Sequence, residues 1–238
     1  MAGSGLVVML KKRVAVALTL NDGVLFRTKR FEPDYRYTAN FVGRDADEVF
    51  VIDVTPRLSR GPDWRANFEK GCRAIVDEMF LPLTIACSIR TLDDCKWALN
   101  DIGADKALVG VEGMTPAMLT PMVERCGQQF VVAGVYGLDD ARLAESWGAG
   151  EILLSDISRD GSLEGYNIPL LQTVAASVNV PVCIQGGCGN WSHMGQAFAA
   201  GADCAVTTNI FHFTDSALKA AKQYLLAQGV DVRRGEAA

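Results

Sequence analysis

The sequence has few of the residues that most directly carry metal or disulfide chemistry. It holds only two histidines, His193 and His212, and they are not at a spacing typical of a metal site. Seven cysteines are present, but no two stand in a C-x-x-C arrangement, and most lie in or beside apolar runs. We therefore expect buried, reduced thiols in a cytoplasmic protein, with no disulfide framework, no metal and no cofactor.

An excess of positive charge and long apolar runs are missing as well. The 23 Lys and Arg residues against 28 Asp and Glu give a net charge of −5, which argues against a general nucleic-acid-binding protein, because neutralising phosphates needs a basic surface. The apolar stretch Leu6–Leu10 is too short to span a bilayer, and its Lys and Arg residues follow it. The sequence predicts no nucleic-acid partner, no membrane partner and no signal peptide.

What the sequence does contain is an internal repeat. An apolar run that ends around Asp53 is echoed by one around Asp156, and Gly103-Ala104-Asp105 by Gly201-Ala202-Asp203, each roughly a hundred residues later. Two such halves within 238 residues favour a single (β/α)8 barrel, the α/β fold of TIM barrels. We expect one domain over residues 1–238, built from half-barrel repeats at about 12–125 and 126–228.

Short apolar runs without strict alternation predict eight parallel strands, which alternate with amphipathic segments that predict helices. The expected strands are Val14–Leu20, Val49–Thr55, Leu83–Ile89, Ala107–Val111, Phe130–Tyr136, Ile152–Ile157, Pro181–Gln185 and Cys204–Asn209. The expected helices are Asp63–Glu78, Leu92–Ile102, Thr115–Arg125, Asp139–Trp147, Ile168–Val178, Ser192–Ala200 and Ser216–Gln228. The stretch from Tyr37 to Asp47 has room for one or two helical turns, so the first helix is expected to be shortened.

The ends of the last three strands carry residues suited to binding an anion. In a parallel barrel the chemistry lies where the carboxyl ends of the strands meet. Taken singly, a Gly-Gly pair is usually a turn and a Thr or Asn is often a helix cap. Together at adjacent strand ends, backbone amides and hydroxyls predict a phosphate site. The site residues are Gly161, Gly186, Gly187, Thr208 and Asn209.

The first half has the matching positions but different residues. Cys87-Ser88 stands where the second half has Gly186-Gly187, and Gly110-Val111 where it has Thr208-Asn209. Side chains at the first pair obstruct the approach of an anion to the backbone, and a Val side chain cannot donate a hydrogen bond. The sequence therefore predicts one phosphate site and not two.

Charged residues open four of the expected strands, at the opposite end of the barrel. They are Arg13, Glu48, Lys106 and Glu151. Because each needs a partner once it is removed from water, we expect them to form a ring of ion pairs. A ring that only seals the barrel floor explains them as well as a functional gate does.

Several of these segments are familiar. Gly148–Leu154, Arg159-Asp160-Gly161 with Gly165-Tyr166, Gly186-Gly187 and Phe211-His212-Phe213 closely resemble the cyclase subunit of imidazole glycerol phosphate synthase. The resemblance implies a barrel that docks through its floor on a glutaminase subunit and passes ammonia to a phosphorylated small molecule at the top. It also implies a gate of two basic and two acidic residues, whose positions match the four charged strand openings.

The acid–base residues of that family are not matched. The resemblance implies one acid near the end of strand one and another at the end of strand five, and these align with Thr19 and Val135. Neither exchanges protons near neutral pH. Losing a general acid or base typically costs about 10²–10⁴-fold in rate, which argues against efficient formation of imidazole glycerol phosphate. Asp53 and Asp160 do match acidic positions of the family and are the remaining catalytic candidates.

The segment Lys29–Tyr37 resembles a divergent branch found beside surface-polysaccharide genes. Three hypotheses follow. The first is an ammonia-using synthase or lyase subunit that acts with a glutaminase on a phosphorylated sugar or a nucleotide sugar. The second is a genuine cyclase subunit of histidine biosynthesis. The third is a non-catalytic barrel that binds and activates a glutaminase.

Overall fold

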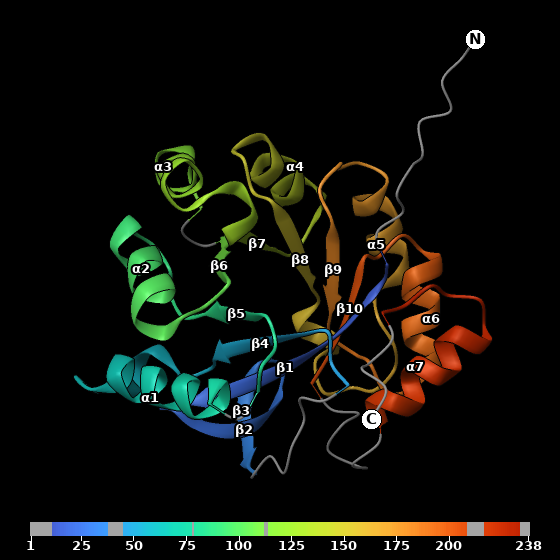
Figure 1. The fold of residues 1–238 in the computed structure, drawn as a ribbon, viewed down its shortest axis with the longest axis horizontal. Helices are drawn as coiled ribbons and strands as arrows, with labels where there is room; N and C mark the ends of the chain where they lie inside the picture. The colour runs from blue at the N-terminus through green and yellow to red at the C-terminus, as the bar shows by residue number, and fades with distance from the viewer. Residues whose placement is uncertain (1–10, 38–44, 78, 112–113, 209–216, 234–238) are drawn as a thin grey trace.

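Eight parallel strands close into a barrel in the computed structural model, which describes residues 11–37, 45–77, 79–111, 114–208 and 217–233 (Figure 1). Each strand pairs with the next along the chain, and the last pairs back onto the first. The barrel strands are β1 (Arg13–Asn21), β4 (Glu48–Asp53), β5 (Leu83–Ala86), β6 (Lys106–Gly110), β7 (Val131–Val135), β8 (Glu151–Ser155), β9 (Val182–Gln185) and β10 (Cys204–Thr207). The predicted TIM-barrel fold is confirmed.

Helices cover the outside of the barrel (Figure 1). They are α1 (Trp64–Val76), α2 (Leu92–Trp97), α3 (Pro116–Cys126), α4 (Leu138–Ser146), α5 (Ile168–Ala175), α6 (Trp191–Ala199) and α7 (Ala217–Ala227). Each matches a helix expected from the sequence, although α2 continues into a π-helical turn at Ala98–Ile102. Start signals act as predicted at α2, where Thr91 and Asp94 form a capping box.

The connection between β1 and β4 contains an element that was not expected from the sequence. Its described residues form an antiparallel hairpin of β2 (Val24–Lys29) and β3 (Glu32–Arg36), ahead of the stretch expected to be helical. The hairpin was missed because its turn is Arg30-Phe31, which lacks the Gly or Asn that such turns favour. Both turn residues adopt left-handed φ values, of 56° and 57°. Residues 38–44, which held most of the expected helical turn, lie outside the described residues.

Alternate strand residues face inward and outward. The inward-facing cluster is small and consists of Ala15, Ala17, Phe50, Val132, Leu153, Cys183, Cys204 and Val206, with Ile52 and Leu108 packed against it. The outward-facing residues join the helices in a larger cluster that holds most of the core. Because side chains of adjacent strand positions point to opposite faces, this assignment decides which strand-end residues face the barrel mouth.

Six of the seven cysteines are buried, which confirms the predicted burial of the thiols. Burial raises the pKa of Cys95 to about 12 and that of Cys188 to about 11. Thiols of this kind stay protonated near neutral pH and are poor nucleophiles. Among the described helices, none is long and apolar enough to cross a membrane.

Candidate functional site at the two ends of the barrel

The barrel floor carries a closed ring of four charged side chains. Arg13 Nη1 lies 2.6 Å from Glu48 Oε2, and Arg13 Nη2 also pairs with Glu151. Lys106 Nζ completes the ring, at 2.8 Å from Glu48 Oε1 and 2.6 Å from Glu151 Oε2. Each basic residue thus contacts both acidic ones. The structure brings together the four residues that the sequence placed at the strand openings.

Burial and charge act in opposite directions on the titration of the ring. Burial by itself lowers the pKa of Lys106, but the charges of Glu48 and Glu151 outweigh it and the net shift is upward. Burial by itself raises the pKa of Glu151, but Arg13 and Lys106 outweigh it and the net shift is downward. Lys106 and Glu151 are therefore charged at neutral pH, and the contribution of Glu151 to stability is lost as the pH falls through its depressed pKa.

Just inside the ring, two cysteines face the barrel interior. Cys183 and Cys204 are register neighbours on β9 and β10. The Cys183 thiol donates to Glu151 Oε1 at 3.1 Å. The inward row of β9 therefore leads from the ring, past Cys183, to Gln185 at the other end of the barrel.

The upper end of the barrel holds a cavity of about 230 Å³. Strand-end residues surround it, and Phe31 from the hairpin turn also contributes to its wall. The lining residues are Phe31, Ile52, Asp53, Val54, Ala86, Leu108, Gly110, Gly134, Tyr136, Leu153, Ser155, Ile157 and Gln185. A mostly apolar cavity with a few polar groups at the carboxyl ends of barrel strands is the usual form of a TIM-barrel active site.

Asp53 is the carboxylate that lines this cavity. Its Oδ1 accepts hydrogen bonds from the Thr55 amide at 3.0 Å and the Thr55 hydroxyl at 2.5 Å. Its Oδ2 lies 3.1 Å from Arg60 Nη2. Burial raises the pKa of Asp53 above its ordinary value of 3.8, and the contacts with Thr55 and Arg60 offset this only in part. A carboxyl with a raised pKa in a cavity is suited to proton transfer.

Asp160, the other candidate acid, holds the hairpin. Its carboxylate Oδ2 accepts from the Phe31 amide at 2.9 Å, and its carbonyl oxygen accepts from the Arg30 amide at 3.2 Å. Its side chain is buried and is not among the residues that line the cavity. Asp160 therefore acts on the left-handed turn that places Phe31 over the barrel mouth.

This arrangement predicts a difference between two variants of Asp160. Asp160→Ala removes the acceptor for the Phe31 amide, and we expect it to lower the free energy of unfolding by about 1.5–3 kcal/mol, the range for hydrogen bonds to charged groups. Asp160→Asn keeps an acceptor oxygen and should lose less than half of that. Urea unfolding of both variants measures the difference. Equal losses would show that the contact with the turn does not depend on the acceptor.

Thr19 lies on the inward face of the barrel, whereas Val135 lies on the outward face. Thr19 belongs to the inward row of β1, two residues after Ala17, and its hydroxyl donates to the Phe26 carbonyl. Val135 lies in the outward cluster beneath the helices. Gly134 and Tyr136 are the β7 residues that line the cavity. Neither of these two cavity residues is an acid.

The glycines expected at the phosphate site lie where backbone segments pack closely. A Cβ on Gly186 would lie 2.5 Å from the Asp156 carbonyl oxygen, and one on Gly187 would lie 2.2 Å from that of Gly165. Both have φ near 100°, which favours glycine. Gly161 similarly lets its loop approach Thr28 of the hairpin. Thr208 is half-buried beyond β10, and Asn209 lies outside the described residues.

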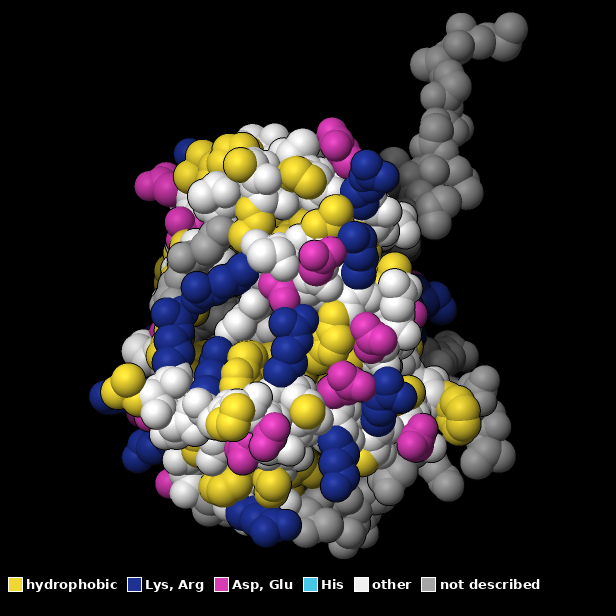
Figure 2. Space-filling view, turned by 90° about the vertical axis from the view of Figure 1, so that its left-hand side faces the viewer, with side chains coloured by type: hydrophobic (Ala, Val, Ile, Leu, Met, Phe, Trp, Pro, Cys, Tyr) yellow, Lys and Arg dark blue, Asp and Glu magenta, His cyan; other side chains and the backbone are white. Residues whose placement is uncertain are grey.

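In the first half-barrel an arginine occupies the corresponding region. Arg60 Nη1 donates to the Ser88 hydroxyl at 2.8 Å, and its guanidinium lies 4.3 Å from the ring centre of Trp64. Ser88 adopts a left-handed φ of 47°. On the face drawn in Figure 2, several Lys and Arg side chains border a hollow, despite the net negative charge. This face therefore carries a local group of basic side chains although the net charge of the protein is negative.

Comparison with known proteins identifies relatives over the whole barrel. A family model described as "Histidine biosynthesis protein" matches residues 135–217. The imidazole glycerol phosphate synthase subunit HisF of Prosthecochloris aestuarii is 31% identical over 255 residues, which cover 94% of this chain and 100% of that protein. The HisF subunit of Clostridium botulinum is also 31% identical, over 257 residues, with the same coverage. The chain belongs to the HisF family.

The likeness to a solved structure supports the fold and nothing beyond it. Thiamine phosphate pyrophosphorylase from Pyrococcus furiosus matches with a TM-score of 0.57 over 92% of this chain and 96% of that one, at 17% identity. At this identity the likeness concerns the barrel and not the chemistry.

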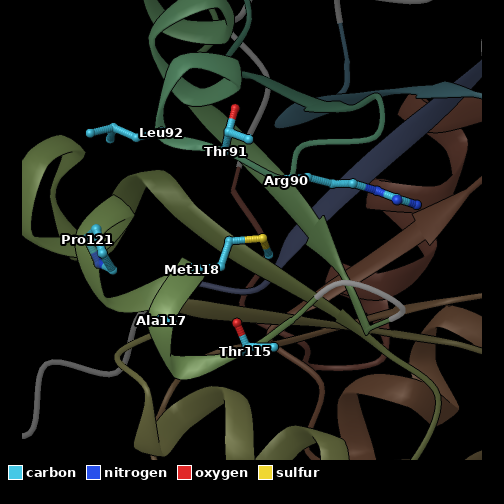
Figure 3. Close-up of a pocket in the computed structure, with 7 residues that line it drawn as sticks. All are labelled: Arg90, Thr91, Leu92, Thr115, Ala117, Met118 and Pro121. Carbon is cyan, nitrogen blue, oxygen red and sulfur yellow. The ribbon is translucent and has the colours of Figure 1, made fainter.

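A second cavity, of about 280 Å³, lies on the outside of this HisF-family barrel between the starts of α2 and α3 (Figure 3). Arg90, Thr91, Leu92, Thr115, Ala117, Met118 and Pro121 line it. In Figure 3 the Arg90 side chain extends away from the residues of α3. Thr91 is already engaged in the capping box of α2, so this cavity offers less free hydrogen-bonding capacity than the barrel mouth.

Sequence reasoning missed Phe31, Arg60, Tyr136 and Gln185. Gln185 had a visible signal, because it is a polar residue at the end of an apolar strand, directly before Gly186. Arg60 had none, since it lies in a loop and reaches Asp53 only through the fold. In the part of the chain that the structure describes, no group of three or more His, Cys, Asp or Glu residues could hold a metal ion.

Proposed function

We propose that this HisF-family protein is an ammonia-using synthase or lyase subunit, which works in the cytoplasm with a glutaminase on a phosphorylated sugar or a nucleotide sugar. The proposal rests on two observations taken together, one at each end of the barrel. The charged ring at the floor matches the four-residue gate that the family resemblance implies. At the other end, Thr19 on β1 and the β7 residues of the cavity, Gly134 and Tyr136, are not acids.

The ring supports a role for ammonia. In this proposal, a glutaminase docks on the floor, and ammonia passes the ring and follows the barrel interior to the cavity. The interior is lined on one side by the small residues Ala15, Ala17 and Cys183. Phe50 faces the same interior and is the largest residue in it, so we expect its rotamer to control the width of the route.

Asp53 supports catalysis in the cavity. Addition of ammonia to an electrophilic carbon requires a group that takes up a proton and returns it. The Asp53 carboxyl, with its raised pKa, lines the cavity and fits that role. The phosphate of the substrate would bind at Gly161, Gly186, Gly187, Thr208 and Asn209. At the corresponding position of the first half-barrel, Ser88 carries a side chain and accepts a hydrogen bond from Arg60.

A direct test uses the phosphoribulosyl-formimino substrate of histidine synthesis with ammonium salts. We expect turnover at least about 10²-fold below that of an authentic cyclase assayed beside it, because a general acid–base residue is worth that much. Equal rates would overturn the proposal and support a genuine cyclase subunit of histidine biosynthesis. The 31% identity to HisF subunits over their full length favours that alternative.

A second alternative is a non-catalytic barrel that binds and activates a glutaminase. Thr19 favours this alternative, because it stands where the family has the strand-one acid and its hydroxyl donates to the Phe26 carbonyl. Under this alternative Asp53→Asn leaves the activity of the complex unchanged.

The segment Lys29–Tyr37, which includes β3 and the hairpin turn, supports the leading proposal, because it resembles the divergent branch found beside surface-polysaccharide genes.

A further inference from the structure

Gln185 is a buried amide without a partner. Its side chain is 2% exposed, and neither Nε2 nor Oε1 makes a hydrogen bond to the residues that the structure describes. Its backbone is fixed, because the Gln185 carbonyl accepts from the Asp156 amide at 3.1 Å. Buried polar side chains are nearly always hydrogen-bonded in folded proteins, so an unpaired amide requires an explanation.

The position of this amide indicates a ligand. Two other buried side-chain atoms in the described chain lack partners, Thr28 Oγ1 and Trp191 Nε1, and neither residue lines the upper cavity. Gln185 does line it, on the inward row of β9. Its neighbours around the cavity wall include the apolar side chains of Ile52, Leu108 and Leu153. An unpaired amide in such a wall lowers the stability of the ligand-free protein, because it has lost its hydrogen bonds to water without gaining others.

The rest of the wall indicates the chemistry of the ligand. Phe31 and Tyr136 contribute aromatic side chains, while Asp53 and Ser155 contribute polar ones. Ser155 and Gln185 are register neighbours on β8 and β9. A ligand that matches this wall has apolar C–H groups for the rings and several oxygen substituents for the amide, hydroxyl and carboxylate. A carbohydrate has both.

We propose that the cavity binds the sugar portion of a phosphorylated sugar, with the Gln185 amide hydrogen-bonded to two neighbouring oxygen substituents of that sugar. One sugar hydroxyl donates to Oε1, and an adjacent hydroxyl or carbonyl oxygen accepts from Nε2, which uses both functions of the amide. Gln185 is then a positioning residue that orients the sugar relative to Asp53. This inference rests on the proposed function, because it names the part of the substrate that the same site holds.

Binding measurements on the full chain test the inference without ammonia or a glutaminase. The probes are fructose 6-phosphate and inorganic phosphate, titrated by calorimetry. We expect the wild-type protein to bind the sugar phosphate at least about tenfold more tightly than phosphate, since two hydrogen bonds of ordinary strength suffice for that ratio. In Gln185→Met the ratio should fall to about one, with the Kd of inorganic phosphate unchanged.

Thermal unfolding separates this role from a structural one. Because Gln185→Met removes an unpaired buried amide and keeps the side-chain length, we expect its Tm to rise by about 5 °C. Thr28→Val is the matched control. It removes an unpaired buried hydroxyl that does not line the cavity, so its Tm should rise as well while the binding ratio stays that of the wild type. Gln185→Glu keeps the shape, loses the N–H donors and should lose the preference for the sugar.

Three outcomes would overturn the inference. Wild-type protein that binds fructose 6-phosphate no more tightly than phosphate is the first. A lower Tm for Gln185→Met with an unchanged ratio is the second, because it would assign the amide to the internal structure. A preference for phenyl phosphate, which carries a phosphate but no sugar, is the third. Since none of these measurements involves ammonia, sugar binding can fail while the ammonia-dependent function holds, and the reverse.

Discussion

Replacing Asp53 with Asn is expected to lower ammonia-dependent turnover by about 10²–10⁴-fold, the usual contribution of a general acid–base residue. Asp53 is the carboxylate that lines the upper cavity. Asn keeps the acceptor for the Thr55 amide and hydroxyl but loses the ion pair with Arg60 and the capacity for proton transfer. Steady-state rates with ammonium salts, at saturating substrate, measure the effect.

The control for this prediction is Asp156→Asn. Asp156 is the related residue at the end of β8, but its carboxylate accepts from Ser158 and Asn167 and does not line the cavity. We expect little change in its rate. If both variants keep the wild-type rate, Asp53 has no part in proton transfer and the non-catalytic alternative is favoured.

The pH dependence of stability checks the state of Asp53 independently of activity. Its pKa is raised in the folded protein from an ordinary value of 3.8. A group of this kind contributes stability below its unfolded pKa, and the contribution is lost as the pH rises through the folded pKa. The Tm of the wild type relative to Asp53→Asn should therefore fall as the pH rises above 3.8. A constant difference would contradict the raised pKa.

Replacing Lys106 with Met is expected to lower the free energy of unfolding by about 3–5 kcal/mol, the cost of removing one partner from a buried ion pair. The substitution leaves Glu48 and Glu151, both buried, to share only Arg13. Met fills nearly the same volume, so the loss reports on charge and not on packing. Urea unfolding at neutral pH measures it.

The same variant tests the ring as a gate. If the ring controls the passage of ammonia, Lys106→Met lowers glutamine-dependent turnover of the reconstituted complex more than ammonia-dependent turnover. Lys222→Met is the matched control, because Lys222 is also buried and pairs with Asp47 at 2.7 Å outside the ring. It should lose stability without changing the ratio of the two rates. A ratio that changes equally in both variants would leave the ring a purely structural role.

The site was partly readable from the sequence because its residues follow strand ends. The four ring residues open strands, and Asp53 closes one. Parallel strands bring their first residues to one end of the barrel and their last residues to the other. Side-chain direction was harder to read. On β7 a shift of one residue exchanges Val135 for Tyr136, since a slip by one reverses the face of every side chain.

The sequence by itself determined the barrel, the number of its strands and the charged floor, because apolar runs, turns and strand openings are local features that repeat along the chain. Only the tertiary structure decided that Asp160 accepts from the hairpin turn, that Arg60 contacts Asp53 and Ser88, and that Gln185 faces the cavity with no partner among the described residues. These facts depend on contacts between segments far apart in the chain. Such contacts exist only after the barrel has closed. Burying a polar group then costs free energy unless the group is hydrogen-bonded.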